Sequence, residues 1–310
     1  MRLKHNLIIL IFLCILCYSC NKNNTAIKPV KGVHILDSQE LPYNYDYLKT
    51  NGNNNIDNNG IPIFTVNDTN HYHPIVIAQK GLDYLSNFRF SNDSIYLDSV
   101  VIYANFLVAS SYQYKDAYWF PYTFDFSLHG FDEDILRSPW YSAMAQGQIL
   151  SLLVRLYEQT NDSNYLNYAT KVFNSFLIDE NNKAPCVIYI DDDGDLWLEE
   201  YPMSQPTNAL NGFNFAIFGI YDYYRLNQND SMAYNLLLKT LTTVKKNIQK
   251  FQEQGEYSYY CLKHKVQNKG YHYIHIEQLQ TLYAITRDSV FIQAVEDLIK
   301  DGEMFEESSN

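Results

Sequence analysis

One short motif recurs four times in this chain and constrains its fold more than any other sequence feature. Asn-Asp-Ser occupies positions 92–94, 161–163 and 229–231, and Arg-Asp-Ser occupies positions 287–289. Each copy lies between two segments whose apolar residues recur at helical spacing. The side-chain oxygens of Asp and Ser accept hydrogen bonds from the unpaired N–H groups of a helix's first turn. Each copy therefore predicts a tight turn between two helices.

The spacing of the motif predicts a repeat of helical hairpins. The four aspartates follow one another at intervals of 69, 68 and 58 residues. A repeat of this length with a helical pair in each unit is typical of hairpins stacked in a ring or a solenoid. We therefore expect an all-α fold, an α/α toroid that is an incomplete (α/α) barrel of about four helical hairpins, with an open helical-repeat array as the alternative. The first helices are predicted at 73–88, 140–159, 207–226 and 273–286, and the second at 94–112, 163–178, 231–250 and 289–300.

Long connectors separate the predicted hairpins and span 113–139, 179–206 and 251–272. In the second connector, runs at 187–190 and 196–198 flank an acidic turn and predict one of the short β-hairpins expected in these connectors. Loops on a rigid scaffold often hold functional residues, and Trp119, Trp140 and Trp197 lie in or beside the connectors. By analogy with other α/α rings, we expect an aromatic-lined mouth that holds a sugar chain.

The composition excludes several classes of protein. With 310 residues, 46% of them hydrophobic, the chain can bury a substantial core. Acidic residues outnumber basic ones by 35 to 23, and the net charge of −12 argues against a nucleic-acid partner, which needs a basic surface. Five cysteines are too few for a disulfide-based mini-scaffold. The 28 tyrosines are the unusual feature left to explain.

The N-terminus has the layout of an export signal. Arg2 and Lys4 precede an apolar run over 7–17, and Cys20 follows a small residue. This pattern resembles a bacterial lipoprotein signal, with a plain signal peptide or a single N-terminal anchor as the alternative. We expect lipidation of Cys20 and a lipid-anchored protein of the bacterial cell envelope, facing the periplasm or at the cell surface. The predicted organisation is a lipoprotein-type signal peptide at 1–20, a flexible Asn-rich tether at 21–70 and an α/α toroid domain at 71–305.

The third connector concentrates cationic and phenolic side chains. Lys263, His264, His272 and His275 lie among several tyrosines. No acidic or cysteine partner for a metal is obvious from their spacing, so we expect no metal site. A pocket in which the cations bind a substrate carboxylate and tyrosines move protons fits this composition better.

Other patterns are less specific. Glu199 and Glu200 end the second connector and suit either general acid–base work or a solvated surface. The chain has no glycine-rich phosphate loop and no G-x-S-x-G or H-E-x-x-H motif. Nucleotide-dependent chemistry, serine hydrolysis and standard zinc proteolysis therefore have no support, and no cofactor is expected.

Several stretches resemble, in the same order, the C-terminal helical domain of the heparan-sulfate D-glucuronyl C5-epimerases. They cover roughly residues 94 to 300. A further stretch, 77–82, is similar to a family segment that normally precedes a large β-rich region, and no room for that region follows here. The matching stretches are 140–148, 199–202, 210–213, 219–222, 260–264 and 271–272 with 275–280.

The resemblance implies a set of site residues. The family's active-site arginine is Lys263 here, which loses bidentate recognition of a carboxylate, and Glu277 stands where the family has an asparagine. The implied catalytic residues are Glu200, Tyr201, Tyr260 and Tyr271. The expected substrate-binding residues are Trp140, Gln146, Gln148, Trp197, Asn211, Lys263, His264, His272 and His275.

The resemblance also implies the reaction, inversion at C5 of a D-glucuronic or L-iduronic type residue in an acidic polysaccharide. The C5 hydrogen lies α to a carboxylate, so its removal needs the enolate charge to be neutralised, a role expected of Lys263 and His272. A base on one face and an acid on the other exchange the proton. Two alternatives are a uronate polysaccharide lyase, which shares the first step, and a non-catalytic glycan-binding lipoprotein. The oligomeric state is open, with a homodimer as one alternative.

Overall fold

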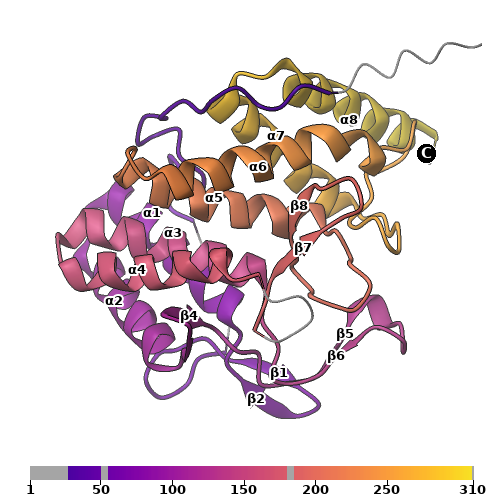
Figure 1. Cartoon of the computed structure of the whole chain (residues 1–310). Coiled ribbons are helices and arrows are strands. Elements are labelled where there is room, and N and C mark those ends of the chain that lie inside the picture. Colours follow the sequence, from indigo (N-terminus) through magenta and orange to yellow (C-terminus); the bar gives the residue numbers. More distant parts are fainter. Residues whose placement is uncertain (1–26, 50–54, 180–184, 309–310) are drawn as a thin grey trace, which may run out of the picture.

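The computed structural model describes residues 27–49, 55–179 and 185–308. In this part of the chain, four helical hairpins follow one another and stack in chain order, as Figure 1 shows. The predicted pairs are therefore confirmed, and the hairpins form an incomplete α/α toroid. The first hairpin is α1 (Pro74–Ser91) with α2 (Ser94–Ala109), and the second is α3 (Ala143–Thr160) with α4 (Ser163–Asn174). The third is α5 (Leu210–Leu226) with α6 (Ser231–Asn247), and the fourth is α7 (Lys269–Thr286) with α8 (Ser289–Ser308).

The repeated motif makes the turns as expected. Asn92, Asn161 and Arg287 adopt left-handed backbone conformations and end α1, α3 and α7. Asparagine tolerates this conformation better than most residues. The aspartate that follows then caps the next helix, as when Asp162 accepts a hydrogen bond from Asn164 N. The third turn is longer, because α5 ends at Leu226 and Asp230 caps α6. These local bonds reverse the chain without help from distant residues.

Helices α3 and α5 pack with almost no space between their backbones. A Cβ atom on Gly219 would lie 2.2 Å from the carbonyl oxygen of Gly147, so neither position can hold a larger residue. Further along the same helices, Arg155 Nε donates to Asp222 Oδ2 over 2.9 Å, and both side chains are buried. A buried pair of this kind is costly to break, because either charge alone would be left without a partner.

Short antiparallel hairpins occupy the connectors and the entry to α1, each as a separate two-stranded sheet. The predicted hairpin of the second connector is confirmed, with Tyr189 opposite Trp197. The pairs are β1 (Phe64–Val66) with β2 (Thr69–His71), β3 (Tyr112–Tyr114) with β4 (Ala117–Trp119), β5 (Phe126–Ser127) with β6 (Ile135–Leu136), and β7 (Ile188–Ile190) with β8 (Leu196–Leu198). The described residues also form short 3₁₀ helices: η1 (Leu128–Gly130) between β5 and β6, η2 (Ser175–Leu177) after α4 and η3 (Ile248–Phe251) after α6.

The described part of the expected tether lies against the helices instead of extending from them. The backbone N–H of Leu36 donates to the Tyr221 hydroxyl over 2.8 Å, and the N–H of His34 donates to the Ile285 carbonyl over 2.7 Å. Val30, Leu36 and Leu41 are buried in the main core, because scattered apolar residues between polar ones suffice to anchor an extended segment. A flexible tether is therefore the wrong description of residues 27–49.

The expected signal peptide and the lipidation site at Cys20 lie outside the described residues. Among the residues that are described, no helix is both long enough and apolar enough to cross a membrane.

Candidate active site

A pocket of about 330 Å³ opens where the inner helices α1, α3, α5 and α7 begin. His73 caps α1 and Ser142 precedes α3, while Asn211 and Tyr271 lie in the first turns of α5 and α7. Because helix N-termini carry partial positive charge and unpaired N–H groups, this end of the ring favours an anion. No side chain caps α3 or α5, but Ala143 N donates to the Glu199 carbonyl and Leu210 N to the Tyr260 carbonyl, so only the later N–H groups of each first turn remain for a ligand. We call this space the catalytic pocket.

Glu200 lines the catalytic pocket and is almost entirely buried, with 3% of its surface exposed. It follows β8, and Gly212 of α5 gives it room, since a Cβ at Gly212 would lie 2.3 Å from Glu200 Oε2. Burial raises the pKa of Glu200 to about 7, against smaller lowering effects of hydrogen bonds from Tyr201 and Tyr260. A carboxyl group with this pKa can accept and release a proton near neutral pH.

Two tyrosines connect to this carboxyl group. The Tyr260 hydroxyl donates to Glu200 Oε2 over 2.9 Å, and the hydroxyls of Tyr201 and Tyr260 lie 3.2 Å apart. Burial, followed by the nearby Glu200 charge, raises the pKa of both phenols well above the usual value. Both are therefore neutral and act as hydrogen-bond donors at ordinary pH.

Tyr271 completes the cluster from the first turn of α7. Its ring lies edge-on to that of Tyr260, with centroids 4.5 Å apart. It lines the catalytic pocket and is 38% exposed, whereas Tyr260 is buried behind the pocket wall. Burial of part of the ring raises the pKa of Tyr271. The structure thus brings together all four residues that the sequence analysis names as catalytic.

Aromatic rings form one wall of the catalytic pocket. Trp140 stacks on Tyr122 with a centroid distance of 3.7 Å, and Phe126 stacks on Tyr201 at 5.5 Å. Such flat apolar surfaces suit the C–H faces of sugar rings. Tyr122 and Phe126 are absent from the predicted set, although the dense aromatic composition of the first connector was a signal for them.

Comparison with known proteins identifies the family. The sequence-family model described as D-glucuronyl C5-epimerase C-terminus matches residues 114–300, more than half of the chain. This chain belongs to the D-glucuronyl C5-epimerase C-terminus family.

Two relatives illustrate the extent of the match. D-glucuronyl C5-epimerase of Caenorhabditis elegans is 28% identical over 174 residues, which cover 50% of this chain and 28% of that protein. An uncharacterized protein of Methanocaldococcus jannaschii is 31% identical over 174 residues, which cover 56% of this chain and 54% of that protein. The match therefore spans only about a quarter to a half of the length of these curated relatives.

Solved structures support the α/α toroid. A sugar epimerase from a ruminal bacterium aligns with a TM-score of 0.55 at 12% identity, over 75% of this chain and 59% of that one. Cellobiose 2-epimerase from Bacillus thermoamylovorans aligns with a TM-score of 0.51 at 13% identity, over 74% of this chain and 59% of that one. At this level of identity the likeness concerns the fold alone.

In this member of the C5-epimerase family, Lys263 and His264 do not line the catalytic pocket. Both bind the carboxylate of Asp134 in the first connector, and His264 Nε2 lies 2.5 Å from Asp134 Oδ2. The structure therefore does not support the expectation that these two side chains bind a substrate in the catalytic pocket, because the chain supplies its own carboxylate for them. The sequence analysis missed Asp134, which lies about 130 positions away in the sequence.

In this C5-epimerase family member, His272 and His275 also make contacts inside the protein and do not line the catalytic pocket. His272 and His275 are fully buried, and both approach Ser258, with His275 Nδ1 2.8 Å from its hydroxyl. His272 Nε2 lies 3.0 Å from the Leu298 carbonyl oxygen of α8. Burial lowers the pKa of both, that of His275 to about 3, so neither supplies positive charge. Their expected role in substrate binding is wrong because α8 covers this face of α7.

The remaining predicted residues divide between pocket and core. Asn211 lines the catalytic pocket, and its Oδ1 is buried without a hydrogen-bond partner among the described residues. Gln146 is buried and bonds to Tyr118 O and Ser175 Oγ, and Trp197 Nε1 donates to Asp191. Substrate binding is therefore wrong for Gln146 and Trp197, whose polar atoms already have partners.

Two further residues of the matching stretches lie off the catalytic pocket. Gln148 lines an adjoining pocket of about 340 Å³ that shares Gln79, Phe215 and Ile274 with the catalytic pocket, and it does not line the catalytic pocket itself. Glu199 is buried and accepts hydrogen bonds from the backbone and hydroxyl of Thr207. Only Glu200 of the acidic pair faces the catalytic pocket.

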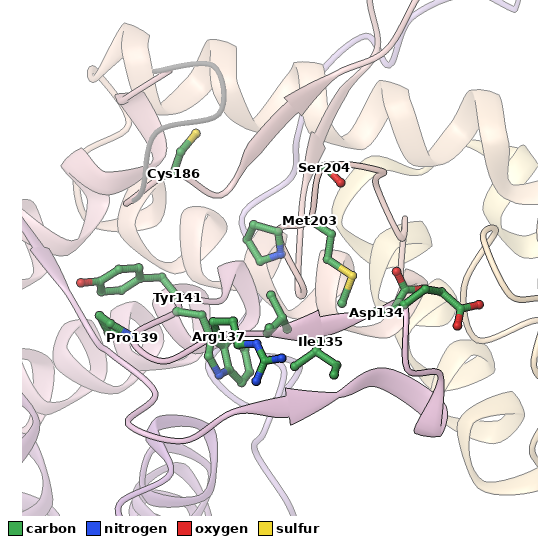
Figure 2. A pocket seen from close by; sticks show the side chains of 12 residues that line it. Asp134, Ile135, Arg137, Pro139, Tyr141, Cys186, Met203 and Ser204 are labelled. Atoms are coloured by element: carbon green, nitrogen blue, oxygen red, sulfur yellow. The ribbon is translucent and has the colours of Figure 1, made fainter.

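A second pocket of about 290 Å³ shares Trp140 with the catalytic pocket. Figure 2 shows its lining, in which Arg137 lies near Ile135 and Met203. The Arg137 guanidinium pairs with Asp125, but both side chains are largely exposed, so this ion pair is weak. Trp140 thus forms part of the lining of both pockets.

Proposed function

We propose that this protein is a uronosyl C5-epimerase that inverts C5 of glucuronic or iduronic type residues within an acidic polysaccharide. One observation carries the proposal: a buried carboxyl group with a pKa of about 7, Glu200, shares an aromatic-lined pocket with the accessible phenol of Tyr271. Membership of the D-glucuronyl C5-epimerase C-terminus family supports the same reaction.

The ionised Glu200 carboxylate takes the C5 proton from one face of the sugar ring. The C5–H electrons move into the adjacent carboxylate and form an enediolate. The Tyr271 hydroxyl then gives a proton to C5 from the opposite face, which inverts the centre. Tyr271 regains its proton from solvent through its exposed edge, and Glu200 releases the proton it took. Atoms and charge therefore balance without a redox step.

The enediolate needs stabilisation that no lysine or arginine of the catalytic pocket lining supplies. The N-terminal turns of α3 and α5 provide partial positive charge at this end of the ring, together with the N–H groups that follow the backbone-bonded Ala143 and Leu210. Fixed donors of this kind stabilise the negative charge that develops in the transition state.

Incubation with a panel of uronic-acid polysaccharides in deuterated water tests the reaction. We expect deuterium at C5 of one of them and a change in its C5 configuration, without new ultraviolet absorbance. An absorbing, chain-cleaved product would instead identify the lyase, which eliminates across C4–C5. Binding without either change, by a folded protein, would identify a glycan-binding protein and refute the epimerase.

We also propose that Cys20 carries a lipid that anchors the protein in the cell envelope. The apolar run before this cysteine supports the proposal. Membrane fractionation of cells that express the wild type and Cys20→Ala tests it. Release of the variant is expected, and equal retention of both would refute lipidation at this residue.

A further inference from the structure

We propose that His129, Cys261 and His264 form a binding site for a zinc-class divalent cation, separate from the proposed epimerase chemistry. One potential ligand atom from each residue lies within 4.8 Å of the other two. His129 comes from η1 in the first connector, and the other two come from the turn after Tyr260. No single stretch of sequence contains this set.

The two sulfur–nitrogen distances fit a tetrahedral centre. Cys261 Sγ lies 3.6 Å from His264 Nδ1 and 3.8 Å from His129 Nε2. With Zn–S bonds of about 2.3 Å and Zn–N bonds of about 2.0–2.1 Å, a tetrahedral ion separates sulfur and nitrogen ligands by about 3.6 Å. A small movement of the His129 side chain, which is exposed, completes the geometry.

Asp134 supplies the outer contact that metal-bound histidines require. Its Oδ2 lies 2.5 Å from His264 Nε2, so the Nε2–H donates to the carboxylate and Nδ1 presents its lone pair to Cys261. A carboxylate–histidine pair of this kind fixes the tautomer and orientation of a metal ligand. Residue spacing in the sequence shows no acidic or cysteine partner for a metal. In the folded chain Asp134 and Cys261 fill these two roles.

The backbone turn at His129 positions its ring beside the other two residues of the site. Its φ of 53° lies in the left-handed region, as do those of ten other non-glycine residues of the described chain, and Gly130 follows with a φ of 81°. This turn carries the His129 ring against Tyr260 and His264, at centroid distances of 5.2 and 5.3 Å.

The chemistry of the donors favours zinc. One thiolate and two neutral imidazoles suit a borderline-soft cation better than calcium or magnesium, which prefer oxygen ligands. Binding replaces the thiol proton of Cys261 by the metal, so one proton leaves to solvent for each ion bound. The fourth position is filled by water. The bound ion would link the first connector to the turn that follows Tyr260. This link would restrict the movement of Tyr260, which lies behind the wall of the catalytic pocket.

Metal titration of the purified, reduced and metal-free protein tests the site. We expect one zinc ion per chain in competition with a chromophoric chelator, with release of one proton. Cobalt as a stand-in for zinc should give the visible bands of a tetrahedral centre and a near-ultraviolet thiolate charge-transfer band. Cys261→Ser should remove the charge-transfer band, and Asp134→Asn should weaken binding about 10- to 100-fold.

Cys186→Ser is the matched control, because Cys186 lies at the other end of the second pocket from Asp134 (Figure 2). This control should leave zinc binding unchanged. If Cys261→Ser does not fold, His129→Ala is used instead, because it replaces an exposed ligand. His129→Ala should weaken zinc binding and leave the fold intact. Absence of stoichiometric zinc, or equal affinity in the wild type and the folded ligand variants, would overturn the proposal. C5 deuterium exchange is measured separately, so either proposal can fail without the other.

Discussion

The Tyr260 hydroxyl donates a hydrogen bond of 2.9 Å to Oε2 of Glu200, and both groups are buried. Tyr260 does not line the catalytic pocket, whereas Glu200 does. We therefore regard Tyr260 as a positioning residue that tunes the carboxyl group, and Glu200 as the group that meets the substrate. This division of roles leads to the first two predictions.

Tyr260→Phe should move the pH dependence of the reaction. As a base, Glu200 is active when ionised, so the rate should rise with pH through the pKa of about 7. The Tyr260 hydrogen bond favours the carboxylate and lowers this pKa, and its loss should shift the rising limb upward by about one pH unit. Initial rates of deuterium exchange across pH measure the shift. Tyr259→Phe is the control, and an unmoved limb in Tyr260→Phe would contradict the assigned role.

Glu200→Gln should abolish exchange and stabilise the protein at alkaline pH. Burial raises the pKa of Glu200 from 4.5 to about 7, so its favourable contribution to folding is complete below 4.5 and is lost as the pH rises through about 7. Glutamine stays neutral, and the gain at pH 8 should be on the order of 3 kcal/mol. Denaturant unfolding at pH 4.5 and pH 8 measures it. Equal effects at both pH values would refute the raised pKa.

Tyr271→Phe should remove exchange without unfolding the protein. The substitution keeps the ring that lies against Tyr260 and deletes only the proposed acid, so we expect a loss of about 100-fold or more in rate with an unchanged Tm. Tyr273→Phe, on the same helix but bonded to Glu306, should retain full activity. Full activity of Tyr271→Phe would remove this phenol from the mechanism.

Gly212→Ala should displace the Glu200 carboxyl group. The added Cβ would lie 2.3 Å from Oε2 and 2.6 Å from Cβ of Glu200, so we expect about 1–3 kcal/mol of destabilisation together with a loss of exchange. Gly32→Ala is the control, because the nearest atom to its Cβ would be the Tyr234 hydroxyl at 3.6 Å. Exchange at the wild-type rate in a folded Gly212→Ala protein would show that the carboxyl position is not critical.

The helical pairs were predictable because their signals are local. The side chain of Asp230 reaches the N–H groups of Met232 and Ala233 without any other part of the fold. Apolar periodicity marks the buried side of each helix in the same way. Glu200, Tyr201, Tyr260 and Tyr271 were singled out by the resemblance to the epimerase family and not by a local physical signal, and the ring of hairpins brings them together.

The charge partners were not predictable, since they depend on which surfaces meet after folding. His272 and His275 lie three positions apart and share a face of α7, as the sequence indicates, but only the packing of α8 decides that this face is buried. Lys263 and His264 likewise read as free cations until the first connector brings Asp134 to them. By itself the sequence determined the helices and their turns, because short-range hydrogen bonding and periodicity specify them. The tertiary structure alone decided which charges face the pocket, because a charge is paired or free according to contacts between residues far apart in the chain.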